Sequence, residues 1–292
     1  MDLGPDGVAV ACVERPRTGR PRLRFADWRP AEDEEQALAA LAAVEKTRSL
    51  RGAAAVGVMD PTSYSLLLVE APDVEPAELR AALRWRIKDL IDFHIDDAVI
   101  DVFDLPGDAP RRHTRMMYVV AARAAAVRAR VDALDATHLE LGAIDIPELA
   151  LRNVTALLPE DVGGVALLHV CGGHGLVVIT HQSSLYLART IDIDVAPGDA
   201  GERAAETLTL EIQRSLDYYE SHFGQPPVQA VVVSRDTPGA AIEEHLRGTL
   251  AVAVRTFDPA TALDCDQAPA PELAARCLTA IGAALRQERT AL

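Results

Sequence analysis

Hydrophobic and polar residues follow two different periods along the chain, and together they predict a mixed α/β fold. Short apolar or alternating runs, bounded by glycine, proline and aspartate, predict β-strands. Longer runs with apolar residues three and four positions apart predict helices. The expected strands span residues 2–13, 21–28, 53–60, 64–72, 96–106, 115–123, 139–146, 164–171, 174–182, 184–191, 228–234 and 250–257. The expected helices span residues 31–49, 75–91, 124–137, 147–158, 202–222, 239–248 and 271–287.

The segment from residue 64 to residue 146 forms a distinct unit in this pattern. Its expected order is strand, helix, strand, strand, helix, strand, with an exposed loop at 107–114. This order is typical of a ferredoxin-like arrangement, in which helices cover one face of an antiparallel sheet. The last strand, 139–146, either completes this unit or belongs to the parent domain. The apolar stripe of the first helix is formed by Leu79, Leu83, Ile87 and Leu90.

The rest of the chain divides into two halves of similar pattern. We expect a first half at 1–162, carrying the inserted unit at about 63–138, and a second half at 163–292. Each half begins with a glycine-punctuated hairpin, and Gly172 and Gly173 form the tight turn of the second one. A helix and a buried strand follow in both. Two facing α/β halves enclose a cleft, which is a usual place for a ligand.

Composition narrows the range of functions. The chain has 292 residues, 49% of them hydrophobic, and a formal net charge of −15. Such an acidic chain lacks the basic surface that general nucleic-acid binding requires, and it does not suit direct binding to an anionic membrane. Its only lysines are Lys46 and Lys88, and neither lies in a glycine-rich turn, which excludes a Walker-type phosphate loop.

The cysteines and the apolar stretches indicate a cytosolic protein. The four cysteines form no C-x-x-C pair, and we expect them to be reduced and structural. No signal peptide is visible. The longest apolar stretch, residues 165–180, is interrupted by histidine and glycine and does not suit a membrane span.

Three stretches of the sequence resemble one protein family. They are "ELRAALRWRIKDLIDFHIDDAVIDVFDLP" (78–106), "AIDIPELALRN" (143–153) and "EIQRSLDYYES" (211–221). They look like the PilM family of type IV pilus assembly proteins, and most of all like its MshI branch from mannose-sensitive haemagglutinin (MSHA) pili. The type II secretion protein GspL has a similar cytoplasmic domain. The resemblance covers essentially the whole chain.

The resemblance implies an α/β fold of the actin-like (ribonuclease H-like) class, with two domains and a ferredoxin-like 1B subdomain inserted in the first half. It also implies a cytoplasmic location beneath the inner membrane. In this family the N-terminal tail of a PilN-like bitopic membrane protein docks next to the 1B subdomain, and many members bind ATP between the domains. Relatives usually begin with a basic, apolar leader; here Met1 directly precedes Asp2, so the chain is either truncated or without that leader.

The first phosphate-binding turn of the family resembles D-I-G-S-S-S-V-K, and here the corresponding residues are altered. Asp2 and Gly4 remain, but the serines are replaced by Pro5, Asp6 and Gly7. Proline removes a backbone N–H donor, and an aspartate places negative charge against a phosphate. Both changes disfavour ATP.

The other nucleotide elements depart from the family pattern in the same direction. The second phosphate turn reads His169 to His174, around Gly172 and Gly173, with histidine at the acidic metal position. The adenosine loop, S-G-G-x-A in the family, begins with Ser234 but lacks the paired glycines. On the long helix, Glu211 and Arg214 either reach the cleft or lie on the solvated face of an amphipathic helix, and we favour the solvated face.

Other catalytic or metal sites have weaker support. His169, His174 and His181 with Cys171 could approach a zinc site, but polar positions on a sheet explain them more simply. The acidic pair Asp192 and Asp194 is better explained as a solvated strand end than as a two-metal site. No G-x-S-x-G nucleophile elbow occurs, and no catalytic base loop of a sugar kinase is visible.

Aromatic residues suggest where a partner binds. Trp85, Phe93 and His94 lie at a helix-to-strand corner of the inserted unit. We expect Trp85 to pack in the core, and the alternative is a groove that holds an extended peptide. At the end of the long helix, Tyr218, Tyr219 and Phe223 are expected to pack the helix end, with Gly224 as its C-cap, or else to face the cleft.

The sequence therefore predicts a nonenzymatic assembly scaffold. It would have a degenerate nucleotide site, no metal, and a PilN-like tail as its partner, and it could assemble into a ring. The alternative is an ATP-binding protein with Mg²⁺ whose nucleotide state regulates pilus or type II secretion assembly.

Overall fold

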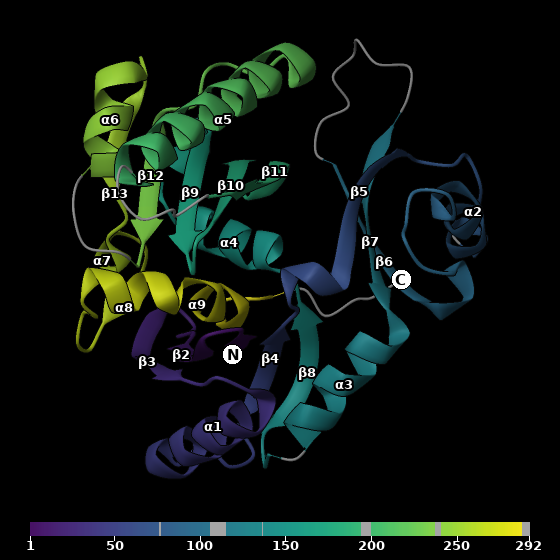
Figure 1. Cartoon of the computed structure of the whole chain (residues 1–292), viewed down its shortest axis with the longest axis vertical. Helices are drawn as coiled ribbons and strands as arrows, with labels where there is room; N and C mark the ends of the chain where they lie inside the picture. The colour runs from purple at the N-terminus through teal and green to yellow at the C-terminus, as the bar shows by residue number, and fades with distance from the viewer. Residues whose placement is uncertain (76, 106–114, 136, 194–199, 237–240, 288–292) are drawn as a thin grey trace.

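In this computed structural model the described residues, 1–75, 77–105, 115–135, 137–193, 200–236 and 241–287, form three β-sheets with helices packed on and between them (Figure 1). The largest sheet has the strand order β14-β3-β2-β1-β4-β8. Its strands are β1 (Asp2–Gly4), β2 (Gly7–Glu14), β3 (Arg22–Pro30), β4 (Ala54–Val58), β8 (Glu140–Asp145) and β14 (Asp264–Cys265). β1 and β2 form an antiparallel hairpin, and β4 runs parallel to both β1 and β8.

The second sheet repeats this plan with the order β11-β10-β9-β12-β13. Its strands are β9 (Val165–Cys171), β10 (His174–His181), β11 (Ser184–Asp192), β12 (Ala230–Arg235) and β13 (Ala253–Thr256). β9 and β10 form the hairpin, and β12 runs parallel to both β9 and β13. The likeness between the two halves that the sequence suggests is therefore present in the strand pairing.

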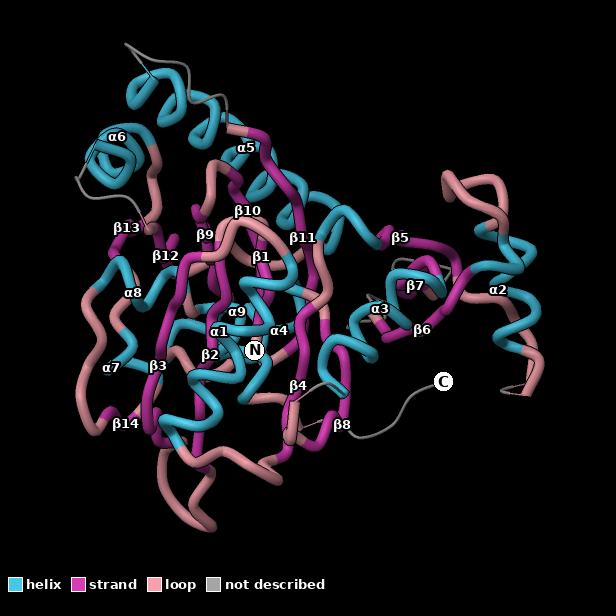
Figure 2. Tube along the Cα trace, turned by 60° about the horizontal axis from the view of Figure 1, so that its bottom comes forward, coloured by secondary structure: helices cyan, strands magenta, loops and turns pink. Residues whose placement is uncertain are grey.

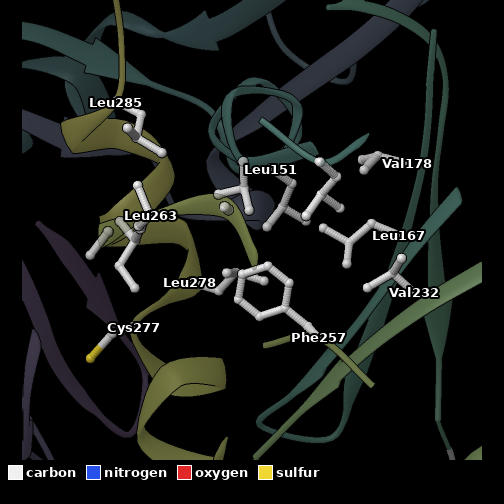
Figure 3. Packing of buried hydrophobic residues seen from close by; sticks show 14 of the residues in the cluster. Leu151, Leu167, Val178, Val232, Phe257, Leu263, Cys277, Leu278 and Leu285 are labelled. Carbon is white, nitrogen blue, oxygen red and sulfur yellow. The ribbon is translucent and has the colours of Figure 1, made fainter. Parts of the chain in front are cut away.

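The helices of the described residues are α1 (Glu34–Arg48), α2 (Leu79–Ile87), α3 (Ala124–Asp135), α4 (Pro147–Thr155), α5 (Ala200–Phe223), α6 (Ala241–Thr249), α7 (Pro259–Ala262), α8 (Pro271–Arg276) and α9 (Leu278–Ala284). Two of them, α4 and α9, connect the large sheets. α9 packs on β2 and β4, α4 packs on β9, β10 and β11, and the two helices pack against each other. Their side chains lie in one apolar cluster with both sheets, where Leu151, Leu278 and Phe257 meet Leu167 (Figure 3).

The third sheet is small and has the order β5-β7-β6, from β5 (Tyr64–Glu70), β6 (Ala98–Asp104) and β7 (Met116–Arg123). One face of this sheet packs on α2, where Leu83 and Ile87 are fully buried. Figure 2 shows α2 at the far edge of this unit, away from the two large sheets. The fourth strand of the predicted unit, β8, pairs with β4 in the large sheet, so of the two placements left open the parent domain holds it.

Several details differ from the expectations. The predicted helix 271–287 is divided at Cys277, whose backbone (φ −100°, ψ 3°) separates α8 from α9. The helix expected at 75–91 covers only Leu79–Ile87, so Leu90 lies beyond its end and is 56% exposed instead of completing the apolar stripe. The expected loop at 107–114 lies outside the described residues, and the division of the chain at 162 and 163 stays a prediction.

Candidate functional site

The turns of the two hairpins face each other across one cavity of about 360 Å³, here called the hairpin cavity. The β1–β2 turn contributes Asp2 to Gly7, and the β9–β10 hairpin contributes His169, Cys171, Gly172 and His174. The segment between β4 and β5 adds Asp60, Pro61 and Thr62, the start of β5 adds Tyr64, and α4 adds Glu148. Arg276 and Thr279, near the α8–α9 junction, complete the lining. The topology thus brings together segments from both ends of the chain.

Glycine is required at three positions of the two hairpins. Gly172 and Gly173 have φ angles of 59° and 80°, the left-handed region that a tight hairpin turn uses. At Gly7, an added Cβ would lie 2.4 Å from the Arg29 carbonyl oxygen and 2.8 Å from the Trp28 ring. The glycines that resemble phosphate-turn residues therefore serve the geometry of the hairpins themselves.

Two carboxyl groups of the cavity accept hydrogen bonds from hydroxyl groups, and that of Glu148 belongs to a buried residue. Thr279 Oγ1 donates a hydrogen bond to Asp2, and Tyr64 Oη donates one to Glu148 at 2.5 Å. Burial raises the pKa of Asp2 and of Glu148, because desolvation disfavours the charged carboxylate. Burial lowers the pKa of His169 to about 4, so this imidazole is neutral at pH 7.

Arg276 links the two sides of the cavity. Its guanidinium lies 3.0 Å from Asp6 in the first turn and 3.0 Å from Asp236 after β12, and it stacks 4.2 Å above the Trp28 ring. Asp236 also lies 3.5 Å from the Gly172 backbone N–H. The arginine in this cavity is therefore already neutralised by two carboxylates.

The structure brings only some of the predicted nucleotide residues together. Among them, the cavity is lined by Asp2, Gly4, Asp6, Gly7 and Gly172, whereas Gly173, Ser234, Glu211 and Arg214 are absent from its lining. Ser234 is buried on β12 beside His169. Glu211 instead forms ion pairs with Arg189 of β11 and with Arg214, and its side chain is only partly exposed. The part of the adenosine loop at 237–239 lies outside the described residues.

The candidate metal residues do not converge. His169 and Cys171 both line the hairpin cavity, but His174 is exposed beside Asp192, and His181 contacts the Val162 carbonyl oxygen. Within the part of the chain that the structure describes, no group of three or more histidine, cysteine or acidic residues could hold a metal ion. Asp194, the second residue of the proposed acidic pair, lies outside that part.

The expectation that Trp85 packs in the core is wrong, because its side chain is 73% exposed. The core of the unit is filled by Leu83 and Ile87 from the opposite side of α2, which leaves Trp85 outside with Lys88 4.7 Å from its ring. Phe93 is half-buried under Arg123, and His94 is exposed.

At the end of α5, by contrast, Tyr219 and Phe223 are buried and Gly224 has a φ of 62°, as expected for a packed, glycine-capped helix end.

A second site lies beside the inserted sheet. A groove of about 260 Å³, here called the β6 groove, runs between Asp101–Asp104 of β6, the end of β8, α4 and the β10–β11 turn. Within the described residues β6 pairs only with β7, so one edge of β6 is open. The Val102 N–H donates to the side chain of its neighbour Asp101 at 2.9 Å, and both residues line the groove.

Asp145 provides a buried acceptor in the β6 groove. Its Oδ1 accepts from the Ile146 N–H at 3.0 Å and pairs with Arg286 at 3.0 Å, while Oδ2 is buried without a hydrogen-bond partner. Burial raises the pKa of this carboxyl group despite Arg286. A buried oxygen without a donor is costly, so a ligand N–H in the groove would be favoured there.

Several polar residues that line these two sites were not predicted from the sequence: Asp60, Tyr64, Asp145, Glu148, Arg276, Thr279 and Arg286. A local signal existed for two of them. Asp145 ends a strand, and Glu148 follows Pro147 at the start of a helix, where polar residues gather at a sheet edge. The partners of Arg276 lie 270 and 40 positions away, and no local pattern predicts them.

No protein-family model matches the chain, and no curated protein matches it. Solved structures do resemble it. A chain of the PilM–PilN type IV pilus biogenesis complex aligns over 97% of both chains, with a TM-score of 0.75 and 18% sequence identity. A protein of unknown function with an actin-like ATPase fold, from Bacteroides thetaiotaomicron, aligns over 90% of both chains, with a TM-score of 0.52 and 10% identity. The protein therefore has an actin-like fold, which confirms the fold expected from the sequence.

Proposed function

We propose that this protein is a nonenzymatic scaffold for the assembly of a type IV pilus at the cytoplasmic face of the inner membrane. The observation that carries the proposal is the likeness to a chain of the PilM–PilN complex along the full length of both chains. The partner would be the cytoplasmic tail of a PilN-like bitopic protein, and membrane contact would come through that partner. Within the described residues, no helix combines the length and apolar character that crossing a bilayer requires.

The β6 groove is the proposed docking site for the tail. An extended peptide gains main-chain hydrogen bonds when it adds to an open sheet edge, and neighbouring pockets hold its alternate side chains. The groove offers the open edge of β6 and apolar lining from Phe103 and Leu149. The part of β6 that lines the groove, Asp101–Asp104, matches a short extended segment in length.

Asp145 gives this groove a preference among tails. Its Oδ2 has no donor, and Arg286 already pairs with Oδ1. A tail that brings an amide or a cationic N–H to this point satisfies the buried oxygen. A tail that brings only apolar groups leaves it unsatisfied, at roughly 1–3 kcal/mol.

The scaffold is proposed to work without nucleotide. Pro5 lacks the N–H that a phosphate would use, and Asp6 and Arg276 already form an ion pair in the turn. The carboxyl groups of Asp2 and Glu148 also face the same cavity. These features support a degenerate, pseudo-ATPase site.

Two finer assignments are part of the same proposal. The sequence resemblance to MshI favours an MSHA-type pilus, and a family of ring-forming assembly proteins favours a homo-oligomer. The second candidate function is an ATP-binding protein whose nucleotide state regulates pilus or type II secretion assembly. It is favoured by the retention of both hairpin turns around one cavity.

Fluorescence anisotropy with a labelled tail peptide of the PilN-like protein tests the docking. We expect saturable binding that weakens at least tenfold in Ser184→Trp, because Ser184 lines the groove and an indole would fill it. Ser221→Trp places the same side chain on the exposed surface of α5 and should leave binding unchanged. Equal affinity for both variants would contradict docking in the β6 groove.

Thermal unfolding with ATP and Mg²⁺ separates the two functions. A ligand at one hundred times its Kd raises the free energy of unfolding by about 2.7 kcal/mol. We expect no such rise at millimolar nucleotide. A clear rise that requires Mg²⁺ would favour the ATP-binding alternative.

A further inference from the structure

The lining of the hairpin cavity contains more carboxyl groups than arginine or lysine side chains. Its described lining holds the carboxyl groups of Asp2, Asp6, Asp60, Glu148 and Asp192. Arg276 is the arginine among the same lining residues, and it is paired with Asp6 and Asp236. Arg130 and the Met1 amino group offset part of the charge on Asp2. Burial raises the pKa of Asp2 and of Glu148, and a cation placed beside these carboxyl groups would favour their ionised form, whereas an anion would oppose it.

His169 supplies an independent sign of a ligand. The side chain is 7% exposed, it lines the cavity, and its Nδ1 has no hydrogen-bond partner. Cys171, two positions along the same strand, lines the cavity as well, so this face of β9 is turned toward it. A neutral imidazole nitrogen without a partner is satisfied by a ligand N–H.

The rest of the wall is apolar and suits a short hydrocarbon stem. Pro5, Pro61, Trp28 and Leu176 line the cavity between the polar groups. Its volume of about 360 Å³ lies at the lower end of small-molecule sites, which run from roughly 300 to 1,000 Å³. The space therefore fits a small ligand with an apolar stem and a charged end that donates hydrogen bonds.

We propose that the hairpin cavity binds a small organic cation, an alkylamine or alkylguanidine, in the place where this fold could hold a nucleotide. The charged end lies among Glu148, Asp60 and Asp2, where it donates to the carboxylates and to His169. The inference concerns the hairpin cavity and not the β6 groove, so its failure leaves tail docking untouched.

Agmatine and putrescine are the probes, and isothermal titration calorimetry of the whole chain is the assay. We expect one site per chain for at least one of them. Fully methylated putrescine, a bis(trimethylammonium), carries the same two charges as putrescine but has no N–H donor, and it should bind at least tenfold more weakly. Mg²⁺ alone should show no comparable site.

Glu148→Gln tests the location. The amide oxygen of glutamine still accepts from Tyr64, but the charge is gone, so Kd for agmatine should rise at least tenfold. Glu35→Gln removes one charge from the exposed first turn of α1, outside the cavity, and should leave Kd unchanged. Asp60→Asn is the second cavity variant if Glu148→Gln fails to fold.

Three results would overturn the inference. The first is an equal loss of affinity in Glu35→Gln, which means diffuse attraction to an acidic protein. The second is fully methylated putrescine or Mg²⁺ binding as tightly as agmatine. The third is ATP binding more tightly than either amine, which would make the cavity an anion site.

Discussion

Replacing Gly282 by alanine tests the close crossing of α4 and α9 that joins the two large sheets. A Cβ at Gly282 would lie 2.0 Å from the Ala150 carbonyl oxygen and 2.5 Å from its carbonyl carbon. Carbon and oxygen ordinarily approach to about 3.3 Å, so the helices must separate by roughly 1.3 Å. Ala150 and Gly282 are both buried, and Asn153 also donates to the Gly282 carbonyl oxygen at 3.0 Å.

The expected loss of stability follows from these contacts. Overpacking a buried site costs about 1–3 kcal/mol, and the upper end applies because the obstacle is backbone. Alanine returns up to about 1 kcal/mol through its better helix propensity. We therefore expect a net loss of about 2 kcal/mol and a drop of about 4–8 °C in the unfolding midpoint.

Thermal unfolding followed by circular dichroism measures this loss, and Gly248→Ala is its matched control. Gly248 lies exposed in α6, and a Cβ added there would enter open space, so the same substitution should be neutral or slightly stabilising. If Gly282→Ala unfolds at the same temperature as the unmodified protein, the helices do not cross as closely as described.

Three further predictions test other parts of the structure. Arg235→Ala removes two 2.9 Å contacts from the carboxylate of Glu243, a residue that is 2% exposed. The free energy of unfolding in urea should fall by about 3–5 kcal/mol, and an unchanged midpoint would refute the buried pair. His169 has a pKa of about 4, below its usual 6.5, so between these pH values the unfolded chain binds more protons than the folded chain. The free energy of unfolding should therefore fall by about 2–3 kcal/mol from pH 7 to pH 4.5, and it should fall less in His169→Gln. Equal losses in both proteins would contradict the burial of this imidazole. Trp85→Ala should change stability by no more than about 0.5 kcal/mol, because the side chain is exposed; a larger loss in thermal unfolding would place it in the core.

The period of the apolar residues was sufficient to predict most elements. Strands such as β9 and β12 are continuous apolar runs because they are buried on both faces, and the sequence shows this directly. The hairpin turns were predictable from Gly172 and Gly173, since few other residues adopt their backbone angles. Helix ends were harder, because the break at Cys277 has no proline or glycine to mark it.

The candidate site was predictable only where its residues lie in local motifs. Asp2 and Gly4 were found because they belong to a recognisable turn. Arg276 and Glu148 were not, because tertiary packing alone brings them to the cavity. The expectation for Trp85 was wrong because the packing of the unit also decides which face of α2 is buried. Leu83 and Ile87 fill the core from one face of this short helix, and Trp85 lies on the exposed face.

Hydrogen exchange of the nucleotide-free protein, with and without the PilN-like tail peptide, tests the central claim most directly. The account predicts slower exchange of the amides at the open edge of β6, around Val102, and no change at the turns of the hairpin cavity. Protection at the hairpin turns, or protection of β6 only when ATP and Mg²⁺ are present, would contradict a scaffold that holds its partner without nucleotide.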